Sequence, residues 1–392
     1  MIKTKYNIII VFGTRPEAIK MAPVIREFKK YRGVNLVNVS VSQHIEMLKQ
    51  VLQAFDINLD YNLNIMSNNQ TLFSISRKAL KGFEKILTKI NPDLIVVQGD
   101  TTSAFIGALS AYYKKIPVAH IEAGLRTYDK YSPFPEEANR RLISVIADYN
   151  FAPTLQAKKN LLLENIDKNS IYITGNTGID ALLFMARKKT SSSSSDNPKF
   201  AKQLASVDFD RKIILITAHR RESFGSPLKN ICNAIRKLSK LNPNVEFIYP
   251  VHLNPNVNKP VFNALSENKR IHLVPPLSYD VFVQLMKRSH IILTDSGGIQ
   301  EEAPSLNIPV LVMREVTERP EAIKAGVARL VGTNKAKIVE ETQKLLNNKR
   351  HYELMATGAN PYGDGYAAHR IVKCLLGKKF YEFNSKVKSS GN

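Results

Sequence analysis

Cysteine is scarce in this sequence. The 392 residues include only Cys232 and Cys374, which lie far apart in the chain. Two such thiols form neither a disulfide framework nor a zinc cluster, so we expect no redox or metal chemistry and no cofactor. This cysteine usage fits a reducing cytosol, and we predict a cytoplasmic protein.

Long apolar segments are also missing. The apolar run at residues 8–12 is too short for a signal peptide. No other segment approaches the length that a membrane-spanning helix needs. We therefore expect no membrane insertion.

Acidic residues are the minority among the charged ones: 34 Asp and Glu face 56 Lys and Arg, a net charge of +22. Such an excess would suit nucleic acid, an acidic membrane surface or a phosphorylated substrate. Aromatic residues are not interleaved with the basic clusters, and no RNA-binding signature is present. Lysines on solvated helix faces explain the charge more simply, and a nucleic-acid-binding protein is the alternative from another class.

The sequence does contain short apolar runs that alternate with helical stretches. Its length and its 44% apolar content favour two domains. Strands are expected at residues 7–12, 36–41, 94–97, 116–119, 213–217, 245–249, 271–274, 291–294 and 310–313. Helices are expected at residues 16–30, 44–54, 102–113 and 279–288. Nearly continuous apolar strands separated by helices predict an α/β fold with two doubly wound parallel sheets.

Two short segments interrupt this pattern. Residues 175–178, with glycine at both ends, are predicted to act as a hinge between the domains. The serine run at residues 191–195 is interpreted as a flexible surface insertion.

Acidic and basic residues concentrate in residues 120–141. We expect this run to leave a strand, cross a loop and begin a helix at its second proline. Glu136 and Glu137 would then lie in the first helical turn, paired with Arg140 and Arg141 respectively. Taken alone, an ordinary helix start explains these four residues better than catalysis does.

Polar residues follow two consecutive strands in the first half. Asp100 comes after the strand that starts at residue 94, and Glu122 comes after the next one. The carboxyl ends of strands line the ligand crevice in open α/β sheets. Asp100 could instead cap the following helix. In the first glycine turn, Arg15 and Lys20 would face an anion, although many such turns bind none.

The second half offers a further set of polar residues. His219 ends a strand beside two arginines, which would suit a diphosphate or could be ordinary solvated cations around a capping histidine. Ser296, Gly297 and Gly298 would let a phosphate approach a helix start. Glu302, one turn further on, is well placed to accept hydrogen bonds from ribose hydroxyls.

These motifs together resemble those of the non-hydrolysing UDP-N-acetylglucosamine 2-epimerases. The resemblance spans nearly the whole chain and lies in GTRPEAIKMAP (13–23), QGDTTS (98–103), HIEAGLRT (120–127), SPFPEEANR (132–140), HRRESFG (219–225), DSGGIQEEAPSL (295–306) and TERPEA (317–322). It implies two Rossmann-like domains in the GT-B arrangement with a cleft between them. The first would comprise residues 1–176 with 366–392, the second residues 177–365, and the protein would be a homodimer.

The resemblance also implies roles for individual residues. Asp100, Glu122, Glu136 and His219 match the family's catalytic groups. The UDP-sugar would be bound by Arg15, Lys20, Arg126, Phe282, Ser296, Gly297, Gly298, Glu302 and Arg319. Gln43 and His44 match a segment near a proposed activator site, from which Ile45, Glu46 and Asn69 depart. Ala218 stands where members usually have glycine.

The implied reaction interconverts UDP-N-acetylglucosamine and UDP-N-acetylmannosamine, precursors of surface polysaccharides, by anti elimination and re-addition of UDP. The C2 hydrogen has no neighbouring carbonyl, so departure of UDP must assist its removal, and clustered carboxylates would raise one another's pKa. Two alternatives stay open within this reading. One is C2 epimerisation of a related UDP-acetamido sugar, such as UDP-N-acetylfucosamine or a diacetamido uronate, and the other is another GT-B glycosyltransferase.

Overall fold

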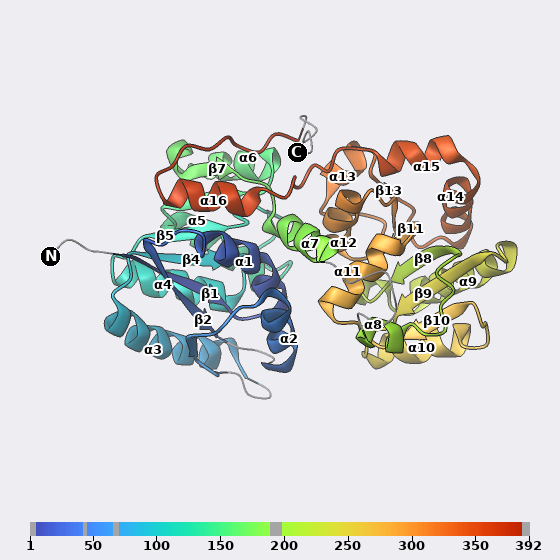
Figure 1. The fold of residues 1–392 in the computed structure, drawn as a ribbon, viewed down its shortest axis with the longest axis horizontal. Helices are drawn as coiled ribbons and strands as arrows, with labels where there is room; N and C mark the ends of the chain where they lie inside the picture. Colours follow the sequence, from blue (N-terminus) through green and yellow to red (C-terminus); the bar gives the residue numbers. More distant parts are fainter. Residues whose placement is uncertain (1–4, 42–44, 66–69, 189–197, 386–392) are drawn as a thin grey trace. The chain divides into compact units, whose positions relative to one another are not determined.

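The computed structural model describes residues 5–41, 45–65, 70–188 and 198–385 (Figure 1). The chain divides into two compact units. Unit 1 comprises Met1–Ala181 and Tyr362–Asn384, and unit 2 comprises Leu182–Pro361 and Ser385–Asn392. The chain leaves unit 1 within helix α7 (Thr177–Arg187) and returns at Tyr362. None of the helices in the described ranges is long and apolar enough to cross a membrane.

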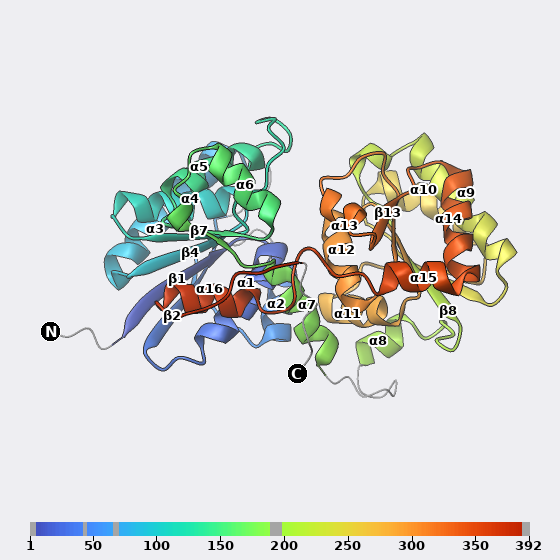
Figure 2. The ribbon, with the colours of Figure 1, turned by 90° about the horizontal axis from the view of Figure 1, so that it is seen from above.

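Unit 1 is built on a seven-stranded parallel sheet with the order β3-β2-β1-β4-β5-β6-β7. Its strands are β1 (Tyr6–Phe12), β2 (Val34–Ser40), β3 (Tyr61–Asn62), β4 (Leu94–Gln98), β5 (Val118–Ile121), β6 (Tyr149–Ala152) and β7 (Ile171–Ile173). Its helices include α1 (Arg15–Phe28), α2 (Ile45–Phe55), α3 (Leu72–Ile90), α4 (Thr102–Tyr113), α5 (Glu136–Ile146), α6 (Leu155–Leu163) and α16 (Ala367–Leu375). In Figure 2, α1 and α16 lie on one face of the sheet and α3 to α6 on the other.

Unit 2 repeats the design with a six-stranded parallel sheet in the order β10-β9-β8-β11-β12-β13. Its strands are β8 (Lys212–Thr217), β9 (Val245–Pro250), β10 (Ile271–Val274), β11 (Ile291–Thr294), β12 (Val310–Val312) and β13 (Ala328–Leu330). Its helices are α8 (Pro198–Gln203), α9 (Ser226–Leu241), α10 (Pro255–Leu265), α11 (Tyr279–Arg288), α12 (Gly297–Glu302), α13 (Pro320–Lys324), α14 (Lys335–Asn347) and α15 (Lys349–Ala356). One apolar cluster joins the sheet to α9, α10 and α14.

The prediction of two doubly wound parallel sheets is confirmed. Every expected strand is present, although β5 starts two residues later than the expected 116–119, since the buried run continues to Ile121. Helix α3 was not foreseen. In both sheets the strand order reverses at the middle, between β1 and β4 and between β8 and β11. Ligands of open α/β sheets bind at such switch points.

Helix α7 and helix α16 are joined by a buried carboxylate. Asp180 of α7 accepts hydrogen bonds from the backbone N–H groups of Ala367, at 3.2 Å, and Ala368, at 2.9 Å, in the first turn of α16. Burial raises the pKa of Asp180 from 3.8 to about 7, against the lowering effect of these two hydrogen bonds. The start of α16, which packs on α1, is thus fixed by a titrating group.

This carboxylate gives a prediction for stability. Between its ordinary pKa of 3.8 and about 7, the folded protein holds a proton that the unfolded chain has released. The Asp180 contribution to stability is therefore largest at low pH and falls as the pH rises through this window. Asn keeps an acceptor oxygen but cannot titrate. Between about pH 5 and about pH 8, the Tm measured by calorimetry should therefore fall less in the Asp180→Asn protein than in the parent. Equal losses in both proteins would contradict the assignment.

Candidate functional site

Glu122 lies at the centre of a cluster of polar side chains in unit 1. It follows β5 with a positive φ of 67°, and its side chain is 7% exposed. Lys20 of α1 donates to both of its carboxylate oxygens, at 2.5 and 2.7 Å. Gln98, at the end of β4, and Asn176, at 3.3 Å, also donate to it. Residues from three segments far apart in the sequence therefore hold one carboxylate.

Asp100 is the second carboxylate of this cluster. Its side chain accepts a hydrogen bond from Arg140 of α5 at 2.5 Å, and its backbone oxygen accepts one from Asn139 at 2.9 Å. Burial raises the pKa of Asp100, the guanidinium of Arg140 opposes this, and the charge of Glu122 adds to it. The helix-cap alternative is wrong for Asp100, because Thr101 caps α4 by accepting from the N–H of Ala104. The structure thus brings Asp100, Glu122 and Lys20 together.

A third carboxylate, Glu17, was missed by the sequence analysis. It is buried on α1 and accepts from the N–H groups of Gly13, at 3.0 Å, and Thr14, at 2.7 Å. It also accepts from the hydroxyl of Thr101 at 2.6 Å, so it links the turn after β1 to the turn after β4. Burial raises its pKa, and these donors oppose that effect. The only sequence signal was the Thr-x-x-Glu spacing of a capping box, which the structure contains.

The turn after β1 also packs against the first turn of α4 at Gly13. A Cβ atom at this position would lie 2.4 Å from Oγ and 2.8 Å from Cβ of Ser103. We expect Gly13→Ala to lower the free energy of unfolding by about 1 to 3 kcal/mol, measured by denaturant titration, because a packed turn must shift. Gly33→Ala is the matched control, since nothing lies within 4 Å of a Cβ there. A Gly13→Ala protein as stable as this control would contradict the contact.

The ion pairs expected within α5 are wrong. Glu137 is fully buried and accepts from the backbone N–H groups of Thr127, at 3.0 Å, and Tyr128, at 3.2 Å. Arg140 bridges Glu137 and Asp100, and Arg141 pairs with Glu164 instead. The helix begins one residue after Pro135, which occupies the N-cap. Glu137 and Arg140 are helix neighbours three residues apart, whereas Asp100 and Glu164 come from distant segments.

Glu136 lies half-buried in the first turn of α5. Its side chain forms no hydrogen bond or ion pair within the described ranges, in contrast to its neighbour Glu137. Prolines precede it in the segment Ser132–Pro135, in which both X-Pro bonds are cis. The structure therefore leaves its carboxylate available, and its catalytic role stays a prediction.

His120 is a further residue that sequence reasoning did not select. Its ring is fully buried on β5, and Nε2 lies 2.7 Å from the carbonyl oxygen of Gly99. Burial lowers its pKa to about 4, so at neutral pH Nε2–H donates to that oxygen and the ring is uncharged. Gly99 has a positive φ of 70° and directly precedes Asp100. His120 thus helps to hold the turn that presents Asp100.

Unit 1 contains two further predicted cations. Arg126 has a fully buried side chain, and its Nε and Nη2 donate to the two oxygens of Glu164 at 2.9 and 2.7 Å. It also donates to Leu125 O and Ser144 Oγ. Arg126 therefore anchors the segment after β5. Arg15 lies half-buried at the first position of α1.

In unit 2 the main polar group is a pair formed by His219 and Asp295. Asp295 follows β11, is fully buried, and accepts from the backbone N–H groups of His219 and Arg220, both at 2.8 Å. The hydroxyl of Ser223 donates to the same oxygen, Oδ2, at 3.2 Å. The other oxygen, Oδ1, lies 3.6 Å from His219 Nδ1. Burial lowers the pKa of His219, and the Asp295 charge opposes this. Asp295 thus fixes the backbone of the turn that carries His219 and lies beside its imidazole.

The predicted phosphate residues surround the start of α12. Ser296 occupies the N-cap, and its N–H donates to the hydroxyl of Thr294. A Cβ at Gly297 would lie 3.6 Å from Nη2 of Arg220 and 3.9 Å from Cζ of Arg319, whereas nothing lies within 4 Å of one at Gly298. Gly298 is exposed, whereas Gly297 is buried beside these two guanidinium groups and the carboxylate of Glu318, whose Oε1 would lie 3.5 Å from that Cβ.

The remaining predicted residues of unit 2 are half-buried. Arg319 donates from Nε to Glu301, so part of its charge is already compensated. Glu302 is the last residue of α12, and Phe282 lies on α11. Their roles toward a ligand stay predictions.

Two further observations concern other kinds of site. Among the described residues, no group of three or more His, Cys, Asp or Glu side chains is placed to hold a metal ion. Gln43 and His44, the predicted activator residues, lie outside the described residues, as does the serine run at 191–195.

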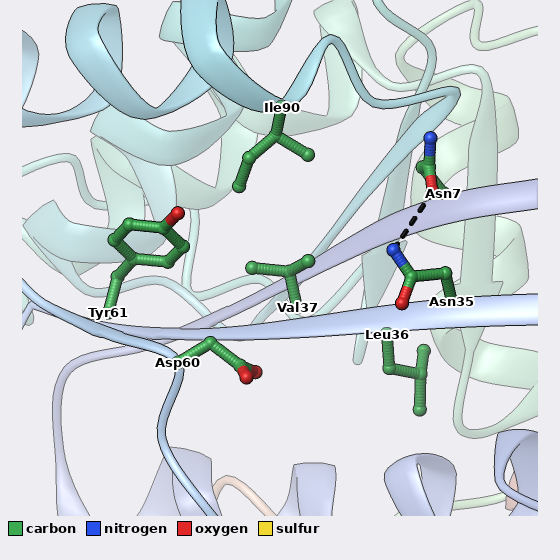
Figure 3. A pocket seen from close by; sticks show the side chains of 7 residues that line it. All are labelled: Asn7, Asn35, Leu36, Val37, Asp60, Tyr61 and Ile90. Carbon is green, nitrogen blue, oxygen red and sulfur yellow. Dashed lines mark hydrogen bonds between the residues drawn. The ribbon is translucent and has the colours of Figure 1, made fainter.

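A cavity of about 460 Å³ lies at the edge of unit 1 where β1, β2 and β3 begin (Figure 3). It is lined by Asn7, Asn35, Leu36, Val37, Asp60, Tyr61 and Ile90. Asn35 donates to the side chain of Asn7 at 3.0 Å, and Asp60 accepts from the N–H of Asn38. Asn7, Asn35 and Tyr61 in this lining are at or near strand starts, whereas Asp100 and Glu122 follow strand ends.

Comparison with known proteins identifies the family. The family model for UDP-N-acetylglucosamine 2-epimerase matches residues 26–376. The chain belongs to the UDP-N-acetylglucosamine 2-epimerase family. Within this family, the Escherichia coli K12 enzyme named UDP-N-acetylglucosamine 2-epimerase is 50% identical over 369 residues, which cover 94% of this chain and 98% of the relative. The Campylobacter jejuni enzyme of the same name is 48% identical, covering 94% and 97%.

Solved structures of the family agree with this assignment. The UDP-GlcNAc 2-epimerase of Neisseria meningitidis, in a crystal structure bound to UDP-GlcNAc, is 49% identical, with a TM-score of 0.87 over 95% of this chain and all of that one. The Methanocaldococcus jannaschii enzyme, in complex with UDP-GlcNAc and UDP, is 38% identical with a TM-score of 0.77. Like its relatives, this chain is an isomerase of the epimerase type.

Proposed function

We propose that this protein is a non-hydrolysing UDP-N-acetylglucosamine 2-epimerase that interconverts UDP-N-acetylglucosamine and UDP-N-acetylmannosamine. The proposal is supported by the relatives' names and by one feature of the site. Two carboxylates, Asp100 and Glu122, follow adjacent strands in different surroundings. Proton transfer at C2 needs such a pair.

The proposed reaction has two steps. In the first, a carboxylate takes the C2 proton while the C1–O bond breaks, UDP leaves with the bonding electrons, and a C1=C2 double bond forms in 2-acetamidoglucal. In the second, C2 receives a proton on the opposite face and a UDP oxygen adds back to C1. Atoms and charge balance without a cofactor.

Asp100 and Glu122 are suited to the two proton transfers, one as donor and the other as acceptor. The raised pKa of Asp100 favours its protonated form, which can donate. Glu122 has Lys20, Gln98 and Asn176 as donors, and these favour its ionised form, which can accept. We propose Glu136 as the third carboxylate.

Unit 2 is proposed to bind and release UDP. Ser296, Gly297 and Gly298 would take the diphosphate, with Arg319 adding positive charge, Glu302 holding the ribose and Phe282 lying near the uracil. His219, oriented by Asp295, would stabilise the charge that develops on the leaving diphosphate. Fixed donors of this kind lower the barrier without reorganising during the reaction.

Incubation with UDP-N-acetylglucosamine in D2O tests the proposal. We expect UDP-N-acetylmannosamine with deuterium at C2, detected by NMR and mass spectrometry, and no free sugar. A glycosyltransferase would leave the substrate unchanged without an acceptor, and a hydrolysing enzyme would release N-acetylmannosamine. If UDP-N-acetylglucosamine stayed unchanged but another UDP-acetamido sugar was epimerised, the substrate assignment would be contradicted and the reaction type would stand. In the cell, the product would supply surface polysaccharide synthesis.

We further propose that the protein is a homodimer. Helices α4 and α5 of unit 1, which pack on each other, expose large apolar side chains at Tyr112, Tyr113, Leu142 and Val145. Such side chains are more typical of an interface than of a solvated surface. Light scattering coupled to gel filtration should give about twice the chain mass of 44.1 kDa. A monomer at micromolar concentration would contradict this.

A further inference from the structure

A second cavity of unit 1, of about 500 Å³, lies along α16 and the segment that follows it. It is lined by Tyr366, His369, Arg370, Lys373, Lys378, Lys379, Phe380 and Tyr381. The lining therefore combines aromatic and basic side chains and contains no carboxylate. Its volume is in the range of small-molecule sites.

The cavity is preformed because its walls are fastened to the rest of unit 1. After α16, the N–H of Phe383 donates to Ile173 O at 2.8 Å, and the ring of Phe383 is buried. The Phe380 ring lies 6.0 Å from that of Tyr172. Arg370 forms two hydrogen bonds with Asp364, at 2.7 and 2.6 Å. The free-energy cost of ordering these walls when a ligand binds would therefore be small.

Charge compensation divides the basic residues of the lining into two groups. Arg370 is paired with Asp364, His369 with Glu27 at 2.9 Å, and the ammonium of Lys378 lies over the ring of Tyr31. The ammonium groups of Lys373 and Lys379 have no hydrogen bond or ion pair with any residue that the structure describes. Two cations are therefore available on the cavity walls.

We propose that this cavity binds a nucleoside phosphate. Lys373 and Lys379 would take the phosphate groups as flexible point charges. The rings of Tyr366, which is 53% exposed, and Tyr381, which is 93% exposed, would stack on the base. Stacking on an aromatic ring contributes about 1–3 kcal/mol per base.

This site is distinct from the carboxylate cluster. His369 contacts Glu27 in the last turn of α1, whereas Lys20, the partner of Glu122, lies about two helical turns earlier. Tyr31, beneath Lys378, follows the end of α1. The proposal therefore neither requires nor extends the proposed catalytic roles.

The chain contains no tryptophan, which permits a site-specific test. Tyr381→Trp places a single indole on the cavity wall at an exposed position. Titration of this full-length variant with ADP should quench its fluorescence saturably. Adding Lys373→Gln and Lys379→Gln should raise the dissociation constant at least tenfold, and inorganic pyrophosphate should bind at least tenfold more weakly than ADP. Phe73→Trp, an exposed reporter on α3, should not respond.

Several outcomes would overturn the proposal. These are no saturable quenching by millimolar ADP, quenching that survives loss of both lysines, or an equal response of the Phe73→Trp reporter. If pyrophosphate bound as tightly as ADP, the proposed stacking of the base on the tyrosine rings would be contradicted. Much tighter binding of a single-stranded oligonucleotide, with a steep salt dependence, would instead assign the surface to a polymer.

Discussion

Replacing Glu122 with Gln is expected to reduce kcat by about 10²- to 10⁴-fold, the usual contribution of a positioned proton-transfer group. Gln is nearly isosteric, but it cannot accept a proton near neutral pH, and it leaves the ammonium of Lys20 without its carboxylate partner. Deuterium incorporation at C2 should fall in parallel with kcat. Rate assays and NMR in D2O measure both quantities.

Glu27→Gln is the matched control for this variant. Like Glu122, Glu27 is a buried glutamate with a lysine partner, Lys30 at 2.5 Å. Glu27 itself lies in the last turn of α1. We expect its kcat to stay within about threefold of the parent, because it touches no reacting group. If Glu122→Gln behaved like Glu27→Gln, the proton-transfer role of Glu122 would be abandoned.

Asp295→Asn is expected to have the second large effect, a loss of about 10²-fold or more in kcat. The carboxylate accepts from two backbone N–H groups and faces the imidazole of His219. An amide offers one acceptor oxygen and no charge, so the orientation of His219 is weakened. We expect Asp295 to act through His219, as a positioning residue.

A pH profile separates this role from a purely structural one. The charge of Asp295 raises the pKa of His219, so its removal should lower that pKa further. The limb of the kcat profile that follows the titration of His219 should therefore move to lower pH. Asp208→Asn, at an exposed ion pair of the same unit, should leave both kcat and this limb unchanged. Asp295→Asn combined with His219→Asn should be no slower than His219→Asn alone.

Most of the secondary structure was predictable from local patterns. The strands that follow apolar runs, such as β1 and β8, appear where expected, because a strand buried on both faces needs a continuous apolar segment. Helix α3 was missed, although its apolar residues do recur at helical spacing. Boundaries such as the start of α5 shifted by one residue, since neighbouring turns share hydrogen bonds.

The sequence by itself determined the fold class, the family and the placement of Asp100, Glu122 and His219 after strands. These follow from apolar periodicity and from motifs that are local in the chain. Only the tertiary structure decided the partners: Lys20 with Glu122, Arg140 with Asp100, Glu164 with Arg126, and Asp295 with His219. In each of these four pairs the two residues come from segments far apart in the sequence. Parallel sheets bring the ends of remote strands together, so the chemistry of the site depends on packing that no local pattern contains.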